Sequence, residues 1–123
     1  METQGQFTFV EINNQDIASQ RRRRLALATA LYDAGLAPRN VQRQEYRDGT
    51  IFWWGDAKKW QPWADIAAVW HLILRFRISI IPSHGKFDTW CVEGNDSAVE
   101  VSGNRIAEAV ANLALYLLRK GEA

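Results

Sequence analysis

The sequence predicts an α+β fold in which a largely antiparallel sheet is covered by helices, in the order β-α-β-β-α-β-β-β-α. Two turn-forming segments, 48–49 and 94–97, each separate two runs of strand-forming residues and therefore indicate hairpins. Other segments repeat apolar residues at helical spacing. The 123 residues suit one domain, 1–123, in which 1–55 and 56–121 are candidate sub-units.

The first half is predicted to contain a strand, a helix and a hairpin. Residues 6–12 largely alternate apolar and polar side chains and are rich in strand formers. Residues 15–34 have helical periodicity, and Gly35 is a typical helix stop. The helix is expected to bury one stripe, formed by Ile17, Leu25, Ala28, Leu31 and Tyr32. Residues 41–47 and 50–54 then form the hairpin.

The second half is predicted to add two helices and three strands. Pro62 suits the first turn of a helix over 62–76, because its missing N–H has no helical partner there. The buried stripe of this helix is expected to be Ile66, Val69, Trp70 and Ile73. Three short strands follow, at 78–81, 87–93 and 98–101. The closing helix begins after 102–104 and is expected to bury Ile106, Ala109, Val110, Leu113 and Leu117.

Composition and charge argue against several classes of protein. An apolar fraction of 47% and a charged fraction of 24% are typical of a globular chain and not of a disordered one. The net charge of +1 gives no overall attraction to nucleic acid or membrane. The apolar stretch 66–81 is interrupted by charge and too short to span a bilayer, and no secretory leader is visible. With Cys91 as the single cysteine, we expect a cytoplasmic protein without membrane association.

Four of the six tryptophans lie in residues 51–63, which read IFWWGDAKKWQPW. From the strand alternation and the helix stripe, three rings are expected in the core: Trp54, Trp63 and Trp70. The interface candidates are Trp53 and Trp60 with Lys58 and Lys59, because exposed tryptophan is enriched among binding hot spots. Even for those two rings, burial in the core is the preferred single interpretation.

The run Arg21–Arg24 is the strongest polar feature of the sequence. Successive helical residues turn by about 100°, so four in a row surround the helix. We expect Arg21 and Arg24 beside the buried stripe and Arg22 and Arg23 facing outward. Solvated arginine is the favoured interpretation. The alternative is a nucleic-acid-binding patch, formed by Arg21, Arg22, Arg23, Arg43 and Arg47.

No residue pattern indicates a reaction centre. The soft ligands His71, His84 and Cys91 lack the spacing of a closed zinc site, so no metal and no cofactor are expected. No phosphate loop, dinucleotide fingerprint or nucleophile elbow occurs. Enzyme activity is therefore not expected. A small enzyme that uses Cys91 or His84 stays open as an alternative, because nucleophile and base meet in space and not in sequence.

Three short motifs resemble a known family. Trp60-Gln-Pro62, followed by Asp65 and Trp70, resembles the opening helix of the phage α-β-α sandwich domain. Asp88-Thr-Trp90 and Ile106-Ala-Glu-Ala109 resemble its tryptophan-bearing strand and alanine-rich closing helix. The resemblance covers roughly residues 56–121, and the closing helix lacks the alanine-cysteine-arginine-alanine pattern frequent in the family. It implies a phage or prophage accessory protein and supplies no catalytic residue.

Together these observations favour a phage- or prophage-encoded binding protein acting in the host bacterial cytoplasm by protein–protein contact. A specific form of this hypothesis is an inhibitor of a host defence component, such as a CRISPR effector or a restriction enzyme. Direct nucleic-acid binding through the arginine helix and a small enzyme are the alternatives, and a homodimer stays open. Nucleic-acid binding predicts an affinity that falls steeply with added salt.

Overall fold

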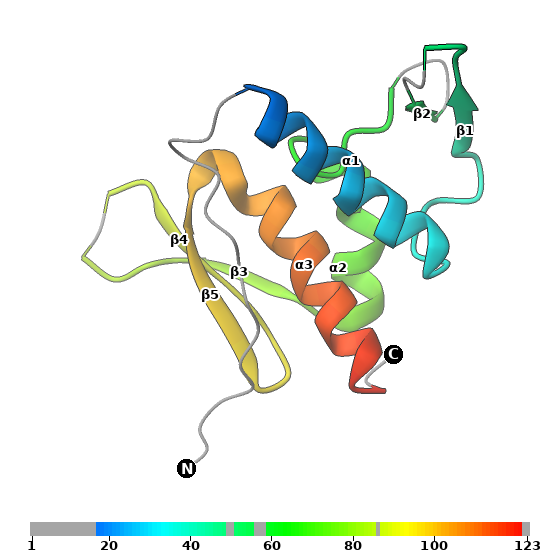
Figure 1. The fold of residues 1–123 in the computed structure, drawn as a ribbon. Helices are drawn as coiled ribbons and strands as arrows, with labels where there is room; N and C mark the ends of the chain where they lie inside the picture. Colours follow the sequence, from blue (N-terminus) through cyan, green and yellow to red (C-terminus); the bar gives the residue numbers. More distant parts are fainter. Residues whose placement is uncertain (1–16, 49–50, 56–58, 86, 122–123) are drawn as a thin grey trace.

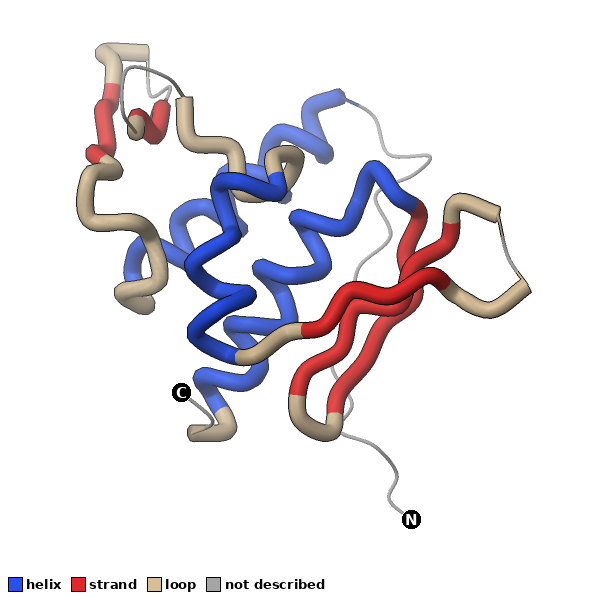
Figure 2. The backbone as a smooth tube through the Cα atoms, turned by 180° about the vertical axis from the view of Figure 1, so that it is seen from behind, coloured by secondary structure: helices blue, strands red, loops and turns tan. Residues whose placement is uncertain are grey.

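The computed structural model describes residues 17–48, 51–55, 59–85 and 87–121, and these form helices and antiparallel strands (Figure 1). The predicted first strand, 6–12, lies outside the described residues. From there on the α-helices and strands follow the predicted order, α-β-β-α-β-β-β-α, and the α+β class is confirmed. The described strands form two antiparallel sheets, a hairpin and a three-stranded sheet, which Figure 2 shows at opposite sides of the helices.

Helix α1, Ile17–Asp33, ends just before Gly35, whose left-handed φ of 77° fits the predicted helix stop. Among the α1 residues whose burial the structure describes, 18–33, the buried ones are Leu27, Ala28 and Leu31 in the C-terminal half. Leu25 is only half-buried and Tyr32 is exposed, so the predicted stripe is partly wrong. After Ile17, residues 18–24 read ASQRRRR and offer no large apolar side chain to the core.

The hairpin joins β1, Gln42–Glu45, to β2, Ile51–Trp54, in antiparallel register. Arg43 lies opposite Trp53 in the ladder. The side chains of β1 are all exposed, as the polar sequence QRQE suggests, so this strand contributes nothing to the core. The buried ring of Trp53 attaches the hairpin to the rest of the molecule.

The second α-helix begins later than predicted. Asp65 has an extended backbone, and its side chain accepts a hydrogen bond from the Ala67 backbone N at 3.0 Å, so it serves as an N-cap. A 3₁₀ turn, η1, follows at Ile66–Val69 and leads into α2, Trp70–Phe76. Arg77, with a left-handed φ of 54°, ends the helix.

The three-stranded sheet consists of β3, Ser79–Pro82, β4, Thr89–Gly94, and β5, Ser97–Ser102, in the order β3-β4-β5. A short turn, η2 at Gly103–Arg105, leads from β5 into α3, Ile106–Arg119. Val92 and Gly94 of β4 are buried, and a Cβ added to Gly94 would lie 3.2 Å from Leu117 of α3. Among the described residues, helices therefore cover one face of this sheet, whereas the α-β-α resemblance implies both (Figure 1).

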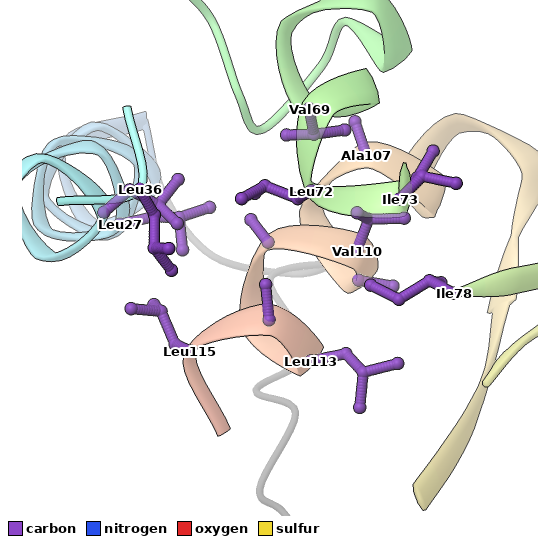
Figure 3. Packing of buried hydrophobic residues seen from close by; sticks show 14 of the residues in the cluster. Leu27, Leu36, Val69, Leu72, Ile73, Ile78, Ala107, Val110, Leu113 and Leu115 are labelled. Carbon is purple, nitrogen blue, oxygen red and sulfur yellow. The ribbon is translucent and has the colours of Figure 1, made fainter. Parts of the chain in front are cut away.

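The core is built around α3, which contacts β4, β5, α2 and α1 (Figure 3). The predicted face of α3 is confirmed, with Ala109, Val110, Leu113 and Leu117 fully buried and Ile106 partly buried. Arg105 and Glu108 are buried as well, with Nε and Oε1 3.1 Å apart. This internal ion pair satisfies two charges that burial would otherwise penalise strongly.

Candidate interaction surfaces

The two tryptophans that the sequence marked as interface candidates are buried. Trp53 is 3% exposed and Trp60 is 5% exposed. Their ring centroids lie 6.4 Å apart in an edge-on arrangement, and the Tyr32 ring of α1 is tilted by 40° against Trp53 with the centroids 4.8 Å apart. The indole Nε1 of Trp60 donates to the Ala68 carbonyl at 3.1 Å. The tryptophan corner, Tyr32, Trp53 and Trp60, therefore joins α1, the hairpin and η1. The preferred interpretation, burial of both tryptophans in the core, is confirmed, and neither ring offers an exposed contact surface.

The neighbouring lysines make Trp60 an interface candidate in the sequence, although burial is the preferred interpretation. Lys59 is exposed, whereas Lys58 lies outside the described residues. Lys59 forms a single antiparallel bridge opposite Trp54, so the chain is extended there. Side chains alternate along an extended chain. An exposed Lys59 is thus consistent with a buried Trp60.

The prediction that Trp70 is a core residue is wrong, because 54% of it is exposed. The buried stripe of η1 and α2 is formed by Val69, Leu72, Ile73 and Phe76. Figure 3 shows Val69, Leu72 and Ile73 on the side of the helix that meets α3. Trp70 follows Val69 by one residue, about 100° around a helix, and so lies outside this stripe. Of the other two expected core rings, Trp54 and Trp63 are partly buried.

An apolar surface on η1 and α2, which we call the α2 face, consists of Ile66, Trp70 and Leu74. Leu74 is 64% exposed and Ile66 40%. Trp70 and Leu74 are four residues apart, so they are neighbours on one side of the helix. The sequence did contain the signal for this surface. The α2 sequence WHLILRF is apolar at five of seven positions, more than one buried stripe requires.

A hollow of about 450 Å³ adjoins the α2 face at Ile66. Three isoleucines from different elements contribute to its wall: Ile66 of η1, Ile80 of β3 and Ile106 of α3. Its polar contributions come chiefly from Asp65 and Asn104. Ile66 therefore belongs both to the α2 face and to the wall of the hollow.

The arginines of the predicted basic patch lie on different parts of the described surface. Arg21 and Arg22 are exposed near the start of α1, whereas Arg23 is partly buried in a groove between α1 and α3. Arg43 pairs with Glu45 at 3.2 Å and lies 5.9 Å from the Trp53 ring centroid. Trp53 packs on Tyr32, and Tyr32 lies ten residues, or roughly 15 Å, along α1 from Arg22. Arg43 and Arg22 are therefore near different ends of α1. Arg24 is partly buried as expected, and Arg47 is exposed on the hairpin.

Cys91 lies in the middle of β4 and is partly exposed. Its Sγ donates to Glu93 Oε2 at 3.5 Å. Burial raises the pKa of the Cys91 thiol, and the hydrogen bond to Glu93 and the charges of Glu93 and Glu100 raise it further. Among the described residues, no hydrogen bond joins Cys91 to His71 or His84. The environment of Cys91 therefore disfavours the thiolate that nucleophilic catalysis requires.

His71 has a structural contact that the sequence did not reveal. Its Nε2 lies 2.6 Å from the carbonyl oxygen of Leu36, in the loop after α1. Because a carbonyl oxygen only accepts hydrogen bonds, Nε2 carries the proton and donates. His84, in contrast, is an exposed residue of the turn between β3 and β4.

The described part of the chain holds neither a metal-ligand cluster nor a membrane-spanning helix. No group of three or more His, Cys, Asp or Glu side chains there is arranged to hold a metal ion. None of its helices combines the length and apolar character that crossing a bilayer requires.

Comparisons of the chain with protein-family models, with curated proteins and with solved structures found no match. The resemblance to the phage α-β-α sandwich domain therefore rests on its sequence motifs alone.

Proposed function

We propose that the protein is a non-enzymatic binding protein that acts by protein–protein contact through the α2 face. The observation that carries this proposal is the exposure of Trp70 beside Leu74 on one side of α2. Contiguous apolar surface of this kind on a monomer is often functional. Tryptophan is the residue type most enriched among binding hot spots. The neighbouring isoleucine-lined hollow gives a partner side chain a place to insert.

The sequence resemblance adds a more specific proposal, that the protein is a phage or prophage product that inhibits a host defence system in the bacterial cytoplasm. Its test is a plating assay on a host with active CRISPR interference or restriction. Expression of the protein should raise the plating efficiency of a targeted phage. Trp70→Ala should lose this effect. An unchanged plating efficiency with the intact protein would contradict the anti-defence role and would leave the binding proposal unaffected.

The binding proposal is tested with a photo-crosslinking amino acid at position 74 of the full-length protein, mixed with host lysate. A crosslinked protein should appear, and the additional substitution Trp70→Ala should remove it. Phe87→Ala is the matched control, because Phe87 is a fully exposed aromatic residue in the turn before β4. It should leave the crosslink intact.

Two results would contradict the binding proposal. One is a crosslinking pattern that Trp70→Ala leaves unchanged. The other is a crosslinked product that nuclease treatment removes, which would favour the nucleic-acid alternative. The separation of Arg21 and Arg22 from Arg43 argues against that alternative.

A further inference from the structure

Resting on the proposed use of the α2 face, we infer that its occupant is a short amphipathic helix. This helix lies antiparallel to α2 and carries acidic side chains in its first turn. Three features of the described surface lead to this occupant: the size of the face, its shape and the charges at its two ends.

The size of the α2 face suits one helix better than a second copy of the chain. A tryptophan buries up to about 250 Å², so the exposed 54% of Trp70 offers roughly 130 Å². With Leu74 and Ile66 the apolar area is on the order of 300 Å², at the small end of single functional patches. A stable dimer needs about 800 Å² from each subunit. The face is therefore too small to hold two copies together by itself.

The face is elongated along α2. Trp70 and Leu74 are one α-helical turn apart, and Ile66 precedes them in the 3₁₀ turn η1 and lines the adjoining hollow. Helices that dock on such surfaces present apolar anchors at i, i+3 or i+4, and i+7. Two to three turns of a partner helix cover this length, and one of its anchors can enter the hollow beside Ile66.

The charges at the two ends of the face differ in sign. Arg75 follows Leu74 in the last turn of α2 and Arg77 is its C-cap, and both are exposed. Neither guanidinium has an ion-pair partner among the described residues. The guanidinium carbon of Arg75 lies 5.2 Å from the centroid of the Phe76 ring. Asp65 lies at the other end, next to Ile66. A partner helix with acidic residues in its first turn complements the arginines when it runs antiparallel to α2, and those residues also suit its own positive N-terminus.

The test uses two fluorescein-labelled peptides of about fourteen residues and the full-length protein. Both peptides carry leucines at i, i+4 and i+7, and they differ in having glutamates or lysines in the first turn. Fluorescence anisotropy should show tighter binding of the glutamate peptide, by about two- to fivefold for each ion pair at low salt. The preference should shrink as salt is added.

Substitutions assign the binding to the face. Trp70→Ala should weaken binding of the glutamate peptide by about thirtyfold, whereas Phe87→Ala should leave it unchanged. The pair Arg75→Gln and Arg77→Gln should remove the preference for glutamate, and Arg75→Glu with Arg77→Glu should reverse it. Melting curves of each variant exclude unfolding as the cause.

Several results would overturn the inference. Equal affinities for the two peptides, or no Trp70-dependent binding of either, would do so. So would Trp70-dependent binding of a uridine-rich oligonucleotide in preference to the peptides. A dimer in sedimentation that Trp70→Ala dissociates would assign the face to a second copy. If neither peptide binds but the Trp70-dependent crosslink at position 74 is observed, the helix inference is wrong and the proposed function is supported. If neither the peptide binding nor the crosslink is observed, the helix inference and the proposed function are both wrong.

Discussion

The tryptophan corner and the α2 face are built from the same kind of residue, and the fold treats them in opposite ways. Trp60 follows a lysine and is 5% exposed, whereas Trp70 stands in a mainly apolar helix and is 54% exposed. Charge next to a ring in the sequence is therefore a poor guide to its exposure. What decides burial is whether another element packs over the ring. Tyr32 and Trp53 pack at the corner, and no described aromatic ring stacks on Trp70.

The largest effect is expected at the corner. Trp60→Ala removes a buried ring, its edge-on contact with Trp53 and its hydrogen bond to the Ala68 carbonyl. Truncating a buried aromatic side chain lowers the free energy of unfolding by about 3–5 kcal/mol. Urea denaturation should show this loss as a lower midpoint. A loss below about 1 kcal/mol would mean that the corner contributes little to holding the hairpin on α1 and η1.

The second prediction compares the loss of stability on the packed side of α2 with that on its exposed side. His71 is next to Trp70, yet its ring donates to the Leu36 carbonyl and ties α2 to the loop after α1. His71→Ala leaves that carbonyl without its donor, which costs about 1–3 kcal/mol if water cannot replace the imidazole. Thermal unfolding of this variant beside Trp70→Ala is the measurement. Equal melting temperatures for the two variants would contradict the assignment of His71 to the packed side of α2 and of Trp70 to its exposed side.

The sequence predicted the parts of this fold that depend on neighbouring residues. The helix end at Gly35, the hairpin 41–54 and the buried face of α3 follow from local turn chemistry and periodicity. The orientation of α2 does not, because apolar residues on both its sides allow two choices of buried stripe. Packing against α3, more than thirty residues later, selects one of them.

Two polar contacts were beyond sequence reasoning for the same reason. The Arg105–Glu108 pair has ordinary helical spacing, and only its position beneath neighbouring elements makes it internal. His71 and Leu36 are 35 residues apart, so nothing local indicates their hydrogen bond. The candidate surface was missed because exposure of Trp70 is a consequence of the orientation of α2.

The third effect compares the face of the three-stranded sheet that packs on α3 with its opposite face. A Cβ at Gly94 would lie 3.2 Å from Leu117, 3.3 Å from Ile78 and 3.4 Å from Leu113. Overpacking of this kind typically costs 1–3 kcal/mol, and the entropy that alanine saves in the unfolded chain offsets part of it, so Gly94→Ala should lose about 1 kcal/mol. Ala98→Val adds two methyl groups at an exposed position of β5 and should be tolerated. Equal tolerance in urea denaturation would mean that α3 is not tightly packed on β4.

The smallest effect on stability is expected at Trp70, the most exposed tryptophan. Trp70→Gln keeps a long side chain with good helix propensity and removes apolar area that already faces solvent, so unfolding free energy should change by no more than about 0.5 kcal/mol. Fluorescence quenching by iodide provides an independent measurement. Arg75 and Arg77 attract the anion toward the α2 face, so Trp70 should be among the most readily quenched rings. Trp70→Phe should lower the quenched fraction more than Trp60→Phe does, and a bound partner should lower it in the same way. If Trp60→Phe has the larger effect, the assignment of the covered and uncovered rings is reversed, and the contact surface lies at the tryptophan corner.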